Sequence, residues 1–69
     1  MSFMGMFPNQ RERRLARDEA WHAVQEHGAK AESFLLMKAQ KTESAERRVI
    51  YKLARKMVSR GGGVTKPVV

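Results

Sequence analysis

The stretch Phe34-Leu35-Leu36-Met37 is the only run of four consecutive apolar residues in the chain. On a helical wheel the alanines around it extend the apolar surface over most of the circumference, and only a narrow polar strip is left. The alanines are Ala29, Ala31 and Ala39, and the strip is Lys30, Ser33 and Gln40. A short helix that is apolar on most sides is covered by neighbours on more than one side. We therefore predict a central helix over residues 29–40, with other helices packed around it.

A second helical pattern precedes this one, over residues 10–27. Its alanine-lined face lets another helix approach closely, and Trp21 adds the large apolar surface that alanines lack. Asn9 is suited to cap the start, and Gly28 is the expected end because glycine adopts the left-handed conformation without a Cβ penalty. His27 is expected either to cap carbonyl groups at the helix end or to pack against the adjacent helix.

The start of this helix is basic. Arg11, Arg13, Arg14 and Arg17 lie near the positive end of its dipole, where cations destabilise the helix. These arginines either serve a partner or belong to a solvated first turn with ion pairs to Glu12 and Asp18.

The clearest amphipathic pattern covers residues 43–59. One continuous arc of this last helix is apolar, and it is wider than a single helix-to-helix contact requires. The arc consists of Val49, Ile50, Tyr51, Leu53, Ala54, Met57 and Val58. Thr42 is suited to cap the start. Because no glycine or proline lies between Gly28 and Gly61, one continuous bent helix is the alternative to a break near residue 42.

The fold class that follows is all-α, a small three-helix domain over residues 10–60. We expect a flexible N-terminal arm over residues 1–9, either frayed or docked on an apolar groove, and a flexible glycine-rich tail over residues 61–69. A chain of 69 residues without cysteine has a small core and no disulfide to support it, so self-association or a partner is plausible. The chain has no apolar run of membrane-spanning length and no typical signal peptide, and we expect a cytoplasmic protein.

Charge is distributed unevenly along the chain. Up to Glu46 there are seven basic and seven acidic residues, whereas beyond it there are seven basic residues and no acidic one. The whole net charge of +7 therefore arises from the last third.

These late cations gather on one side of the last helix and predict a nucleic-acid-binding face. The candidate residues are Arg48, Lys52, Arg55, Lys56 and Arg60. Five phosphate contacts would give a salt dependence with a slope of about −4.5, and the absence of Asn and Gln from this face predicts little sequence preference. A merely solvated face remains the alternative, as does, less well supported, an anionic membrane surface. The alternative function is a protein-interaction or regulatory module that binds itself or another protein through the apolar arc, with or without the Met- and Phe-rich N-terminal arm.

Chemistry-bearing residues elsewhere form no recognisable site. His22 and Glu26 lie one helical turn apart, but a third metal ligand is missing. Gly61-Gly62-Gly63 is not followed by the Lys-Ser or Lys-Thr of a phosphate loop. The sequence therefore predicts no enzyme, no cofactor and no metal site.

The run Ala20-Trp21-His22-Ala23-Val24-Gln25-Glu26-His27-Gly28, continued by Ala31 and Phe34-Leu35, resembles small uncharacterised helical proteins of alphaproteobacteria. In that group a helix ending in His-Gly is followed by a second helix with small and aromatic residues at three-residue spacing. The likeness covers residues 18–57 and implies a bacterial, cytoplasmic, helical protein, without site residues. The basic last helix and the glycine-rich tail depart from that pattern.

Overall fold

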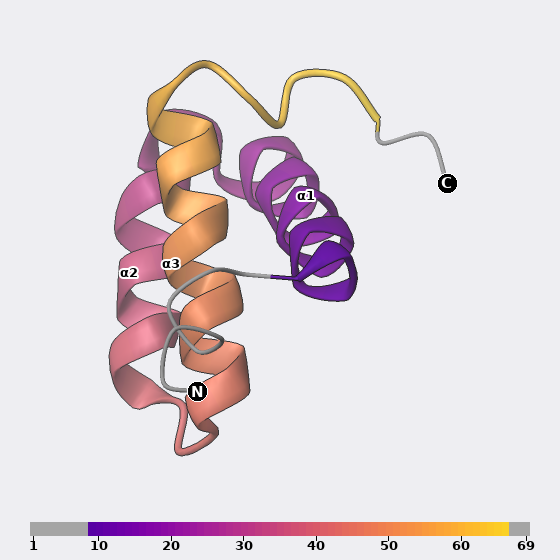
Figure 1. The fold of residues 1–69 in the computed structure, drawn as a ribbon. Helices are drawn as coiled ribbons and strands as arrows, with labels where there is room; N and C mark the ends of the chain where they lie inside the picture. The colour runs from indigo at the N-terminus through magenta and orange to yellow at the C-terminus, as the bar shows by residue number, and fades with distance from the viewer. Residues whose placement is uncertain (1–8, 67–69) are drawn as a thin grey trace.

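The computed structural model describes residues 9–66 as three α-helices packed together (Figure 1). They are α1 (Gln10–His27), α2 (Ala31–Lys41) and α3 (Ala45–Ser59), with a short 3₁₀ turn, η2 (Gly28–Lys30), between the first two. The predicted all-α fold is confirmed, and residues 9–66 contain no strand. The predicted N-terminal arm, apart from Asn9, and the last three residues of the predicted tail lie outside the described residues.

Both ends of α1 are formed by the residues that the sequence indicated. The Asn9 side chain accepts a hydrogen bond from the Glu12 backbone N–H at 2.8 Å, and the Glu12 carboxylate accepts one from the Asn9 N–H at 3.2 Å. This reciprocal capping box satisfies two backbone donors at the helix start. Gly28, with φ of 54°, ends the helix. The 3₁₀ turn that follows delays the start of α2 to Ala31, two residues later than predicted.

The break between α2 and α3 is present, but its capping residue differs from the prediction. Ser44, not Thr42, caps α3: its hydroxyl accepts a hydrogen bond from the Arg47 N–H at 3.2 Å. Thr42 still belongs to the end of α2, because its N–H donates to the Lys38 carbonyl at 3.0 Å. Its hydroxyl accepts from the Ser44 N–H, so both residues shape the turn. As a result α3 begins at Ala45 rather than at residue 43.

The core lies where α3 meets the other two helices. Figure 1 shows α2 and α3 side by side and antiparallel, with α1 packed across them at an angle. Leu35 is the largest fully buried side chain, and most of the other core residues are alanines. The buried residues are Ala16, Ala20, Ala23, Ala31, Leu35, Ala39, Ile50, Tyr51 and Ala54.

Residues 29–40 were predicted to have neighbours on more than one side, and α2 does contact both α1 and α3, but its burial is narrower than its apolar surface. Burial on α2 is confined to Ala31, Leu35 and Ala39, which recur at four-residue spacing and form one stripe. Leu36 and Met37 are each 41% exposed because both other helices meet this single stripe. The helix with the most extensive contacts to both others is α3.

Residues 61–66, which we call the C-terminal segment, turn back over α1. The N–H of Gly61 donates to the Val58 carbonyl at 2.9 Å and that of Gly62 to the Met57 carbonyl at 2.7 Å, which together form a Schellman motif. Gly63 then lies so close to α1 that a Cβ atom there would be 2.8 Å from the Ala20 carbonyl oxygen. Further on, Lys66 Nζ lies 5.9 Å from the centre of the Trp21 ring. Rather than extending away as a tail, this part of the chain contacts α1.

Replacing Leu35 by alanine should destabilise the protein strongly, because it removes the largest side chain of a small core. We expect a loss of about 2–5 kcal/mol in the free energy of unfolding, measured by urea denaturation followed by circular dichroism. The neighbouring change Leu36→Ala is the matched control and should cost well under half as much. Equal losses from the two changes would contradict the packing described.

Replacing Gly63 by alanine should release the C-terminal segment from α1. The residue has φ of 81°, and the added Cβ would collide with both the Ala20 carbonyl and Val24 Cγ2. Quenching of Trp21 fluorescence by acrylamide should therefore increase. Gly28→Ala, also at positive φ but in open space, should leave the quenching unchanged. A Gly63→Ala variant with wild-type quenching would show that the contact does not form.

Candidate nucleic-acid interface

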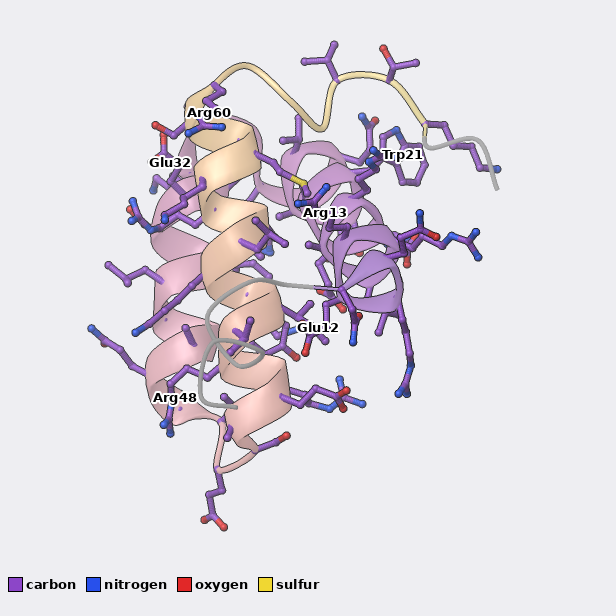
Figure 2. The ribbon with its side chains drawn as sticks, in the orientation of Figure 1. Glu12, Arg13, Trp21, Glu32, Arg48 and Arg60 are labelled. Atoms are coloured by element: carbon purple, nitrogen blue, oxygen red, sulfur yellow. The ribbon has the colours of Figure 1, made fainter. Side chains whose placement is uncertain are left out.

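The five cations predicted to form one ridge on α3 differ in what their side chains contact. Figure 2 shows Arg48 near the start of α3 and Arg60 at its opposite end. Between them, some of the side chains turn toward α2 and others point to solvent. A polyanion can contact most readily those cations that have no partner within the protein.

Arg48 is used to complete the end of α2. Its Nε donates to the Ala39 carbonyl at 3.3 Å, and one terminal nitrogen donates to the Thr42 carbonyl at 3.0 Å. The last carbonyl groups of a helix have no partner within the helix and carry the negative end of its dipole. A guanidinium placed there satisfies them and stabilises the α2–α3 turn.

Arg55 is held against α2 as well. One of its terminal nitrogens lies 3.7 Å from a carboxylate oxygen of Glu32, and its Nε is buried without a hydrogen-bond partner in residues 9–66. Arg48 and Arg55 of the predicted ridge therefore already have partners on α2 or at its end, although Arg48 is itself exposed one helical turn before Lys52.

Lys52 and Lys56 remain directed to solvent. Both residues are exposed, and within residues 9–66 neither ammonium group makes an ion pair or a hydrogen bond. With Val49 and Leu53 they line a shallow hollow of about 180 Å³. Arg60 follows Lys56 by four residues, so Lys52, Lys56 and Arg60 form a row of about 12 Å on successive turns.

The start of α1 supplies further cations that the predicted site did not include. Arg13, Arg14 and Arg17 line a hollow of about 240 Å³ together with Gln10. Arg17 also lines a larger hollow, of about 440 Å³, to which Arg60 contributes from the end of α3. The larger hollow is therefore shared by cations of the two helices. The α1 arginines lie near the positive end of the helix dipole, where cations are unfavourable, and this position was the sequence signal for a second basic region.

We call six exposed cations of the two helices the basic surface, which consists of Arg13, Arg14, Arg17, Lys52, Lys56 and Arg60. Arg47 and Arg48 of α3 are exposed as well, but Arg47 lines a hollow together with Glu19 and Glu46, and Arg48 donates to carbonyl groups at the end of α2. Arg11 is not included, because its guanidinium lies 3.5 Å from the carboxylate of Glu46 on α3. Lys38 of α2 is also engaged: its ammonium lies 3.9 Å from the Glu19 carboxylate and 4.9 Å from the centre of the Tyr51 ring.

Each of the two histidines contacts neighbouring protein groups. His22 does not pair with Glu26; its Nδ1 lies 2.9 Å from the Asp18 carbonyl oxygen and 3.4 Å from the Asp18 carboxylate. The His27 ring stacks on Phe34 of α2 with 3.9 Å between ring centres, which confirms the packing alternative for this residue. Residues 9–66 contain no group of three or more acidic, histidine or cysteine side chains placed to hold a metal ion.

No protein-family model, curated protein or solved structure matches this chain. The resemblance to the alphaproteobacterial helical proteins therefore stays a prediction. In the described part of the chain, none of the helices has the length and apolar character that a membrane crossing requires.

Arg48→Ala should destabilise the fold, whereas Lys52→Ala should not. The first change removes two charge-assisted hydrogen bonds to carbonyl groups of the α2–α3 turn, and we expect a loss of about 1 kcal/mol. The second removes a solvated side chain and should change the free energy of unfolding by less than about 0.5 kcal/mol. Thermal or urea unfolding measures both. Equal stability of the two variants would return Arg48 to the solvated face.

Proposed function

We propose that this protein is a non-enzymatic, cytoplasmic binding protein that contacts the phosphate backbone of nucleic acid with little sequence preference. The observation that supports it is the division of the cations. Four of them, Arg11, Lys38, Arg48 and Arg55, contact acidic groups or carbonyls, while the six cations of the basic surface make no such side-chain contact within residues 9–66. The same holds for Lys30, Lys41 and Arg47, which lie outside the basic surface.

A surface of this kind binds nucleic acid through the release of counterions. Each phosphate that a lysine or arginine neutralises releases condensed cations, and the gain is largest at low salt. Guanidinium groups add bidentate hydrogen bonds to phosphate oxygens, and four of the six members of the basic surface are arginines. The basic surface spans two helices, so several phosphates of one backbone can be contacted at the same time.

Readout of bases has little support in this surface. Gln10 is the only amide side chain among the residues that line the three hollows. Phosphate contacts position a protein on nucleic acid but carry no sequence information directly. We therefore expect similar affinities for unrelated sequences of equal length.

A second candidate function is protein interaction, including self-association. Val49 is 42% exposed and lies beside Leu53 in the shallow hollow of α3, so part of the predicted apolar arc is not used by the core. Sedimentation at several protein concentrations distinguishes this candidate, because self-association would produce a dimer or larger species whose fraction rises with concentration.

Binding to a generic duplex should weaken steeply as salt is raised. Six phosphate contacts correspond to a slope of about −5 in a plot of log affinity against log salt concentration. The double change Lys52→Ala/Lys56→Ala should reduce the magnitude of this slope by about 2, because each lost contact removes about 0.9. Fluorescence anisotropy of a labelled duplex at several salt concentrations measures both slopes.

The matched control is Lys30→Ala/Lys41→Ala, which removes the same net charge from the two ends of α2. Its slope should equal that of the wild-type protein. The proposed function would be contradicted by binding that does not depend on salt, by no binding at low salt, or by an equal effect of the two double variants.

A further inference from the structure

The larger hollow of the basic surface, of about 440 Å³, lies where three parts of the chain meet. Arg17 contributes from α1, Arg60 from the C-cap of α3, and Thr65 from the C-terminal segment. Ala20 and Met57 supply an apolar part of its lining. No acidic residue lines the hollow, so no lining carboxylate neutralises the positive charge that the two arginines bring to it.

The C-terminal segment bounds this hollow because local geometry returns it to α1. The Schellman motif turns the chain at Gly61, after the end of α3, and Gly63 then approaches Ala20 more closely than any side chain would allow. Gly62 and Gly63 themselves line the hollow. Figure 1 shows the segment passing from the end of α3 over α1. The hollow is thus a product of the fold and not a gap between two exposed side chains.

Its charge suits one form of phosphate better than another. A phosphodiester within a strand carries a single negative charge, whereas a phosphate monoester carries about −1.5 to −2 near neutral pH. Two guanidinium groups around one hollow match the higher charge and can supply several charge-assisted hydrogen bonds. The C-terminal end of α3 carries partial negative charge, which disfavours any anion there, and the two cations offset this repulsion.

We propose that this hollow binds the terminal phosphate monoester of a nucleic-acid strand. The inference rests on the proposed function and names the part of the strand that the hollow recognises. The row Lys52, Lys56 and Arg60 leads along α3 to the hollow, and the C-terminal segment bounds the hollow where that row ends. The Thr65 hydroxyl adds a hydrogen-bond donor, while Ala20 and Met57 pack against the terminal nucleoside.

The test compares oligonucleotide duplexes of one sequence whose strands end in a 5′-phosphate, a 3′-phosphate or hydroxyl groups only. Affinities are measured by fluorescence anisotropy with the full chain at one moderate salt concentration. One of the phosphate-ended duplexes should bind at least about fivefold more tightly than the hydroxyl-ended duplex, as expected for additional hydrogen bonds between charged groups.

The variants separate recognition of the end from general attraction to charge. Arg17→Gln/Arg60→Gln should abolish the preference for the phosphate end. Lys52→Gln/Lys56→Gln removes the same net charge and should weaken binding of all three duplexes while their ratio stays at the wild-type value. Gly63→Ala keeps both arginines but displaces the C-terminal segment, and it should also reduce the preference. Since it leaves the two charges in place, it tests the hollow even where the double arginine variant does not fold.

Equal affinities of the three duplexes for the wild-type protein would overturn the inference and leave the proposed function standing. Loss of the preference in Lys52→Gln/Lys56→Gln to the same extent as in Arg17→Gln/Arg60→Gln would also overturn it. Competition by adenosine 5′-monophosphate at concentrations comparable to the phosphate-ended duplex would assign the hollow to free nucleotides instead of strand ends. Absence of binding to every duplex at low salt would contradict the proposed function itself.

Discussion

The structure depends on the close approach of helices whose facing sides carry alanine. Within residues 9–66, six of the nine buried residues are alanines, and Leu35 is the largest side chain that is fully enclosed. Small side chains bring helix backbones near one another, but each contributes little buried apolar surface. The core therefore supplies only a small hydrophobic stabilisation. The same closeness places the end of α3 beside α1. Gly63 can therefore contact Ala20, and Arg17 and Arg60 can line one hollow.

The second organising feature is the set of Lys and Arg side chains that contact carboxylates or carbonyl groups of the protein itself. Exposed ion pairs such as that of Arg11 with Glu46 stabilise a protein by only about 0–1 kcal/mol. Their main effect here is to fix the direction of the paired side chains. Glu32 and the carbonyl end of α2 hold Arg55 and Arg48 against the domain. Three carboxylates, of Glu19, Glu32 and Glu46, thereby pair with cations outside the basic surface. The positive charge left exposed on α1 and α3 gives the protein its proposed attraction to a polyanion.

Much of the fold could be predicted from local sequence signals. Capping and terminating residues determine the backbone only at their own positions, so the helix ends that they form were predicted to within a few residues. These residues are Asn9, Gly28 and the glycines after Arg60. The competition between Thr42 and Ser44 for the α3 cap was harder, because both are good capping residues and only the hydrogen bond from Thr42 to Lys38 keeps Thr42 in α2. A helical wheel also could not show that Leu36 and Met37 stay exposed, since burial depends on where neighbouring helices lie.

The same limit applied to the candidate site. Periodicity placed Arg48 and Arg55 beside Lys52 and Lys56, but their partners lie outside α3, so a wheel of that helix does not contain them. The most direct test of the account is a map of backbone amide chemical shifts by NMR during titration with a short duplex. We predict that the shifts concentrate in the first half of α1, the second half of α3 and the C-terminal segment, and spare the outer face of α2. Shifts centred on α2, or spread evenly over the three helices, would contradict it.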